Sequence, residues 1–202
     1  ELDTGYGLLN AAGGVSPEGR LAATLQGRSI DLARLDKSLS AGLSGTAFVS
    51  ATLSGTIADP QANVRADIFA GECSGYGFDW IGADAQLRKQ EISHFALTLQ
   101  RGTGEGSLSG RLVFPRGTYP GFLSAEGRVE KGQLEYWLPF SELRGQAKGI
   151  FDATVKLQGS LDSPEIAATF RLLRPQVAGM QFDSAEGELR DLIHDEASKY
   201  LP

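Results

Sequence analysis

Apolar and polar residues alternate along much of this chain, which is the pattern of β-strands with one apolar and one polar face. The alternation is cleanest at 151–157, and it recurs at 64–68, 95–99 and 166–172. Segments of roughly six to nine residues are separated by Gly, Pro or Asp-Pro and return about every 10–14 residues, a spacing typical of antiparallel sheets. The pattern predicts an all-β fold.

Three segments depart from period two. Residues 29–39 place leucines on one helical face, with Ser29 or Asp31 as a helix N-cap, and 134–138 stop at Pro139. We expect a short helix in each. The last segment, 189–200, has helical spacing, whereas the internal repeat described next predicts a strand there. Both interpretations stay open.

The chain repeats itself after about 100 to 104 residues. Leu-Ser-Gly-Thr-Ile-Ala-Asp-Pro at 53–60 returns as Leu-Gln-Gly-Ser-Leu-Asp-Ser-Pro at 157–164, and Leu-x-Gly at 43–45 returns at 143–145. Such self-similarity predicts stacked copies of one supersecondary unit. It divides the chain into preceding strands (1–20), a first β-repeat (21–120) and a truncated second β-repeat (121–202), so we expect a piece of a longer protein.

One-sided strands need something against their apolar face. A second sheet, a closed barrel or a ligand would each cover it. The inward positions are often small, and no long amphipathic helix is available as a plug, so the pattern favours an open, strongly curved sheet with an apolar groove. The predicted groove-lining residues are Val64, Ala66, Ile68, Phe95, Leu97, Leu99, Ala153, Val155, Leu157, Ile166, Ala168, Phe170 and Leu172.

The composition of the chain disfavours some classes of binding partner. The 202 residues carry a net charge of −6, and no Lys/Arg cluster offsets it. This balance disfavours nucleic acid and anionic membrane surfaces. The single cysteine, Cys73, excludes an internal disulfide. Apolar runs stay well below the roughly 18 residues of a membrane-spanning helix, so we expect no span in this chain.

Motifs that could carry chemistry are weak. Residues 71–75 read Gly-Glu-Cys-Ser-Gly, but a nucleophile elbow needs a following helix, and a turn and strand are predicted instead. His94 and His194 are distant, and with one cysteine they predict no zinc site. Residues 102–106 lead into a strand, so they form no phosphate cradle.

The remaining candidates are also structural. The acidic residues at 183, 186 and 188 lack calcium-loop spacing and indicate a solvated face. The aromatics Tyr136, Trp137 and Phe140 are typical of helix-to-sheet packing. We therefore expect no enzyme, no metal and no cofactor.

The ordered set of phrases resembles the AsmA-like/TamB family of bacterial envelope proteins. The resemblance rests on 53–61 and 157–165, on the helix followed by Leu-x-Gly at 43–45 and 143–145, and on 104–112 as a closing strand. It covers roughly residues 20–190 and consists of short phrases of low identity.

The resemblance implies a β-taco, a U-shaped hydrophobic groove in the periplasm, held by an inner-membrane anchor outside this chain. It implies phospholipid transport towards the outer membrane, in a protein of outer-membrane biogenesis, and a further partner in an outer-membrane β-barrel assembly protein. Two alternatives stay open. One is a chaperone that templates client strands at a sheet edge. The other is a β-solenoid passenger or adhesin with a closed core, which the length of the repeat disfavours.

Overall fold

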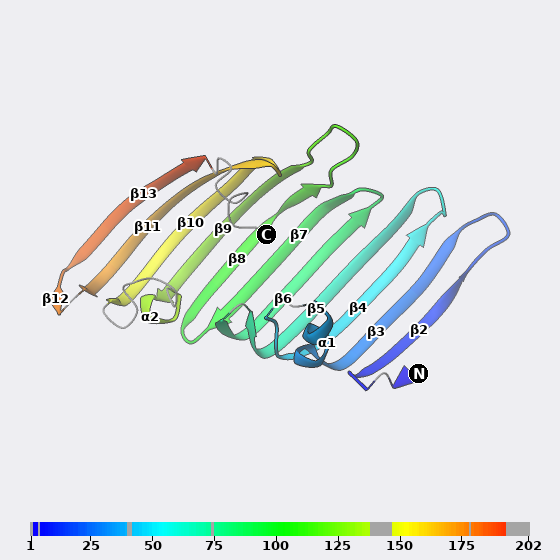
Figure 1. The fold of residues 1–202 in the computed structure, drawn as a ribbon, viewed down its shortest axis with the longest axis horizontal. Coiled ribbons are helices and arrows are strands. Elements are labelled where there is room, and N and C mark those ends of the chain that lie inside the picture. The colour runs from blue at the N-terminus through cyan, green and yellow to red at the C-terminus, as the bar shows by residue number, and fades with distance from the viewer. Residues whose placement is uncertain are drawn as a thin grey trace.

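The computed structural model describes residues 2–3, 5–39, 42–73, 75–137, 147–177 and 179–192. They form one antiparallel sheet of thirteen strands (Figure 1). The strands are β1 (Leu2–Asp3), β2 (Leu8–Val15), β3 (Leu21–Asp31), β4 (Thr46–Gly55), β5 (Pro60–Cys73), β6 (Tyr76–Arg88), β7 (Glu91–Arg101), β8 (Gly104–Val113), β9 (Phe122–Gln133), β10 (Ala147–Ser160), β11 (Ser163–Val177), β12 (Met180–Gln181) and β13 (Ser184–Leu192).

The strand order follows the chain. Each strand from β1 to β11 pairs with its sequence neighbours, and both the short β12 and the longer β13 pair with β11. The sheet does not close, because β2 and β13 lie at opposite ends of it (Figure 1). The predicted antiparallel all-β class is confirmed. The described residues form neither a second sheet nor a solenoid core, the two alternatives that would have covered the apolar face.

Two short helices interrupt the strands, as predicted. α1 (Leu32–Leu39) follows β3 and α2 (Leu134–Trp137) follows β9, at the same end of the strands (Figure 1). Asp31 is the N-cap of α1, because the Arg34 amide donates a hydrogen bond to Asp31 Oδ1 at 3.3 Å. Leu134 of α2 is buried.

The strands are longer than the sequence pattern predicted. β4 to β11 span 10 to 15 residues each. Glycines that looked like breaks lie inside strands: Gly104 and Gly106 belong to β8, and only Gly102 and Thr103 form the preceding turn. Both of these strand glycines are buried.

At the C-terminal end the strand prediction holds as far as Leu192, where β13 ends. Residues 193–200, which could have continued as a helix, lie outside the described residues.

Several backbone features recur 102 or 104 residues apart. Ser29 (φ 52°) and Lys131 (φ 51°) take positive φ three residues before α1 and α2 begin. Ala70 and Arg174 share φ 48°. In both hairpins a glycine pairs with a proline at the turn, Gly55 with Pro60 and Gly159 with Pro164.

The molecule has almost no interior. The buried apolar side chains among the described residues are Ala47, Phe78, Ala125, Leu134 and Ala147. The chain exposes 13554 Å², whereas a compact monomer of its mass, 21.5 kDa, would expose about 9,200 Å². One sheet without a second layer contributes to this excess of roughly 4,400 Å².

Candidate functional site: an uncovered apolar face

One face of the sheet is apolar across most of its width. Residues paired across strands point to the same face, so the register defines rows that run from strand to strand. Three such rows contain only apolar residues and glycine as far as β11, and in β13 the register pairs the first of them with Asp191. The first is Ala11, Leu25, Ala51, Val64, Ala85, Phe95, Gly110, Ala125, Leu157 and Ile166; the second is Leu9, Gly27, Val49, Ala66, Ala83, Leu97, Leu108, Gly127, Val155, Ala168 and Leu189; the third is Ala47, Ile68, Ile81, Leu99, Gly106, Val129, Ala153, Phe170 and Gly187.

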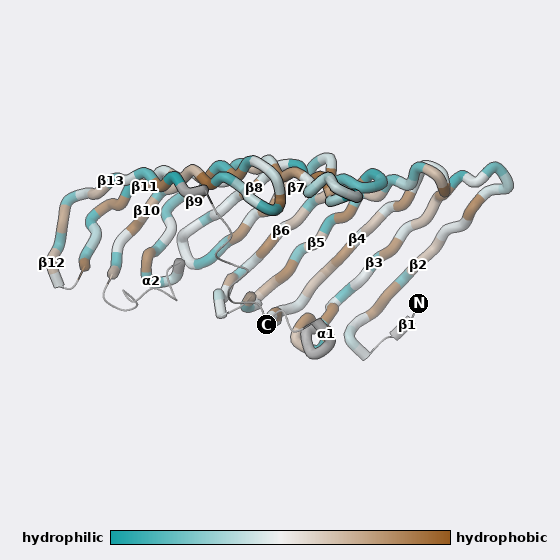
Figure 2. Tube along the Cα trace, turned by 45° about the horizontal axis from the view of Figure 1, so that its top comes forward, coloured by the Kyte–Doolittle hydropathy of each residue, from teal (hydrophilic) through white to brown (hydrophobic). Residues whose placement is uncertain are grey.

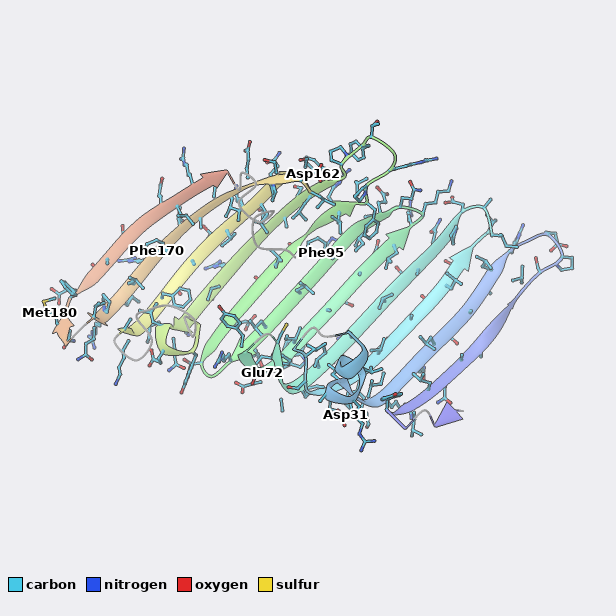
Figure 3. The ribbon with its side chains drawn as sticks, viewed as in Figure 1. Asp31, Glu72, Phe95, Asp162, Phe170 and Met180 are labelled. Atoms are coloured by element: carbon cyan, nitrogen blue, oxygen red, sulfur yellow. The ribbon has the colours of Figure 1, made fainter. Side chains whose placement is uncertain are left out.

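The register places every predicted lining residue on this apolar face. All but Leu172 lie in the three rows, and Leu172 pairs with Phe151 beyond them. Most are half-buried, while Leu97 is 38% and Phe170 39% exposed although nothing polar neighbours them in their rows. Phe95 and Phe170 lie on the body of the sheet, well away from the strand ends that Asp162 and Met180 mark (Figure 3).

Sequence reasoning missed more than half of this face. It overlooked β2, β3, β4, β6, β8 and β9, whose members include Leu25, Val49, Ile81, Leu108 and Val129. In β4 and β6 the alternation is hidden, because an aromatic residue precedes the inward one at Phe48-Val49 and Trp80-Ile81. Gly106 and Gly110 take alternate inward positions in β8, and Gly127 takes one inward position in β9; a glycine carries no apolar signal.

Those inward glycines are not gaps. The ring of Phe170 lies on Gly187, and the ring of Phe151 lies on Gly132. A large side chain that covers a neighbouring glycine restores the packing that the glycine lacks. The face is therefore a close-fitted apolar surface with shallow relief, including a hollow of about 510 Å³ at Leu25 and Leu53.

The opposite face is polar and charge-paired, and the two characters alternate along the strands (Figure 2). Lys156 Nζ lies 3.3 Å from Glu126 Oε1, and Arg171 Nε lies 3.3 Å from Glu186 Oε1. The Thr154 and Thr169 hydroxyls are hydrogen-bonded at 2.7 Å. A larger hollow of about 580 Å³ lies here between Arg128 and Arg171, but both guanidinium groups already have carboxylate partners.

Residues that could carry catalysis are scattered. β5 ends at Cys73, Gly75 is a turn residue and β6 begins at Tyr76, so a strand follows this segment, as predicted, and not an elbow helix. Cys73 and His94 are exposed, on different strands. Over the part of the chain that the structure describes, no group of His, Cys, Asp and Glu could hold a metal ion.

One carboxyl titrates away from its usual range. The Ser16 hydroxyl donates to Glu18 Oε2 at 2.7 Å, and this hydrogen bond lowers the pKa of Glu18. Glu18 lies in the exposed turn between β2 and β3, away from the rows of the apolar face.

The predicted aromatic packing at α2 is described only in part. The Arg101 guanidinium lies 5.3 Å from the Tyr136 ring centroid, so Tyr136 packs on the end of β7. The Trp137 side chain, Phe140 and His194 lie outside the described residues.

In the described ranges, no helix is both long and apolar enough to cross a membrane. Comparison with family models, curated proteins and solved structures gives no match. The function therefore has to be argued from the two faces themselves.

Proposed function

We propose that this chain is a lipid-carrying segment, whose apolar face is the floor of a groove for phospholipid acyl chains. The observation that carries the proposal is the set of apolar rows, uninterrupted from β4 to β11 and not covered by a second layer among the described residues. Exposed apolar patches of monomers rarely exceed a few hundred Å². A face of this extent in water calls for an occupant, and acyl chains fit it without any polar partner.

The proposed working shape is a curved trough, built from repeats of one unit. The register shifts support curvature, because β-bulges bend and twist strands, and they occur between β3 and β4, β6 and β7, and β9 and β10. The recurring bulges, helices and glycine-proline turns support a repeated unit. The resemblance to the AsmA-like/TamB family agrees with both, and we propose on that basis that the trough works in the periplasm between the two membranes.

The proposed transport mechanism is sliding, because no row of the apolar face is expected to bind an acyl chain much more tightly than the next. A fully buried methylene contributes about 0.8 kcal/mol, and a methylene laid on an open face contributes part of this; summed over an acyl chain, the contribution retains a lipid without a specific pocket. Side chains of similar character repeat from strand to strand, so a lipid loses little when it moves by one row. Polar headgroups stay in water, and no catalytic group is required, so we propose a carrier rather than an enzyme.

The test is native mass spectrometry of the chain after incubation with phosphatidylglycerol and phosphatidylethanolamine vesicles. Two adjacent alanines of β11 provide a matched pair: Ala168 lies on the apolar face, and Ala167 lies on the polar face beside Lys156. We expect bound lipid in the wild type and in Ala167→Glu, and at least a tenfold loss in Ala168→Glu, because a carboxylate must be desolvated under an acyl chain. Equal retention by the two variants would contradict the proposal.

A second candidate function, templating of client strands, is supported by the edge of β2. Within the described sheet, β1 pairs only with Leu8 and Leu9, so 10–15 have a strand on one side. This edge carries no charge, whereas edges usually carry protecting charges. Ala12→Lys would abolish binding of an unfolded β-barrel protein under this alternative, and would leave lipid binding unchanged.

A further inference from the structure

The polar face carries an aromatic cluster that the lipid hypothesis does not use. Phe48 of β4, Phe69 of β5 and Trp80 of β6 point away from the apolar rows, since Val49, Ile68 and Ile81 beside them in sequence belong to those rows. Phe48 is 41% and Phe69 44% exposed. Their ring centroids lie 6.0 Å apart, edge to face.

Trp80 is held flat beside this pair. Its indole covers Gly82, where a Cβ would lie 2.5 Å from the ring. Its Nε1 donates to Asp67 Oδ1 at 3.2 Å, and Asp67 Oδ2 lies 3.7 Å from Arg65 Nε. The ring orientation is therefore fixed from below by a glycine and from the side by a carboxylate, which pre-organises the indole.

The fold does not require aromatics at these positions. The residues 104 positions later occupy matching places in β10, β11 and β13, and they are Asp152, Leu173 and Ser184. The glycine under the indole, Gly82, has Glu186 as its counterpart. β10, β11 and β13 pair in the same way without an aromatic residue at these positions. The cluster is therefore a feature of β4, β5 and β6 and is not required by the fold.

We propose that Phe48, Phe69 and Trp80 form a carbohydrate-binding site on the polar face. The carbon-bound hydrogens of a pyranose face carry partial positive charge, and they stack on the negative faces of aromatic rings. Asp67 and Arg65 beside the rings supply an acceptor and donors for sugar hydroxyls. On the register, Thr98 and Gln100 of β7 follow Gly82 and Trp80, and extend this polar rim.

The size of the cluster favours a sugar chain over a protein. At 150–250 Å² for a whole aromatic side chain, the exposed parts of Phe48 and Phe69 sum to roughly 170 Å², and the half-buried Trp80 adds to this area. A stable protein interface takes about 800 Å² from each partner. Two or three sugar units along β5 and β6 match the smaller area. The site lies on the face opposite the apolar rows, so it is independent of the proposed function.

Fluorescence titration tests the proposal, because the chain has two tryptophans and a Trp137→Phe background leaves Trp80 as the reporter. The probes are the hexasaccharide of β-1,4-linked N-acetylglucosamine and maltohexaose. We expect saturable binding of at least one, weakened tenfold or more by Phe69→Leu or Phe48→Asp, which install the residues of the matching positions. Leu173→Ala, equally exposed on the same face, should leave binding unchanged.

Two results would contradict the proposed carbohydrate-binding site. One is the absence of a saturable change with either oligosaccharide while the variant remains folded by circular dichroism. The other is binding that Phe69→Leu and Phe48→Asp do not alter. Lipid retention by these variants should match the wild type, so failure here is distinguishable from failure of the lipid-carrying function.

Discussion

The β4–β5 and β10–β11 hairpins have the same strand pairing. Their apolar faces are alike in character, whereas their polar faces differ. Ala47 pairs with Ile68 in the first, and Phe151 pairs with Leu172 in the second, each 104 residues later. Along the apolar face, residues change identity but never character: Ala51, Leu53 and Val64 become Val155, Leu157 and Ala168.

The polar faces of the same hairpins differ in kind. Phe48 becomes Asp152, Thr52 becomes Lys156, and Asp67 becomes Arg171. Apolar character is therefore common to this face of both hairpins, whereas the residues of the polar face differ and can form a local site in one hairpin alone. An occupant that contacts both regions alike, such as an acyl chain, accounts for this asymmetry.

The largest expected effect tests whether the two apolar surfaces are equivalent. Val64 occupies in β5 the place that Ala168 occupies in β11. We expect Val64→Glu to reduce bound phospholipid at least tenfold, as at Ala168, because each charge interrupts the same kind of row. The matched control is Asn63→Glu, on the exposed polar face of the same strand.

Native mass spectrometry of the two variants, with circular dichroism to verify folding, checks this prediction. Lipid loss at only one of the two positions would mean that one hairpin binds lipid and the other does not.

An intermediate effect is expected from the turn glycines. Gly55 has φ 92° and Gly159 has φ 130°, a region costly for residues with a Cβ. In Gly55→Ala the new methyl would meet the Asp59 carbonyl oxygen directly, while in Gly159→Ala its nearest neighbour is 3.2 Å away. We expect losses of about 3 and 1–2 kcal/mol in the free energy of unfolding, measured by urea denaturation. The reverse order would contradict the turn geometry.

The smallest effect concerns the polar faces. The Thr154–Thr169 hydrogen bond of 2.7 Å is exposed, and its counterparts in the first hairpin are Ser50 and Arg65. A double-mutant cycle with Thr154→Val and Thr169→Val should give a coupling of about 0.5 kcal/mol. Lipid binding should not change in either single variant; a reduction would show that the polar face takes part in it.

Period-two alternation was sufficient to predict the class of fold and the inward residues of four strands. From Phe151 to Gln158 of β10 every second residue is apolar and its neighbours are polar, so the inward residues can be identified without a structure. The turns at Pro60 and Pro164 were also predictable from the sequence, because proline fixes φ and has no amide proton to donate.

The rest depended on long-range pairing. Gly106, Gly110 and Gly127 read as breaks in sequence, but they lie within strands beside larger neighbours such as Leu99, Phe95 and Leu108. The aromatic cluster was invisible because Phe48, Phe69 and Trp80 are far apart in sequence and become adjacent only through the register of β4, β5 and β6. Local patterns cannot show which strand lies beside which.

The most direct test of the central claim is photo-crosslinking from neighbouring positions on opposite faces. Benzoylphenylalanine replaces Leu97, on the apolar face, or Thr98, on the polar face of the same strand. The chain is irradiated with phosphatidylethanolamine vesicles, and adducts are identified by mass spectrometry. The account predicts lipid adducts at position 97 and none above background at 98. Equal labelling at both positions, or labelling at neither, would contradict a lipid-carrying apolar face.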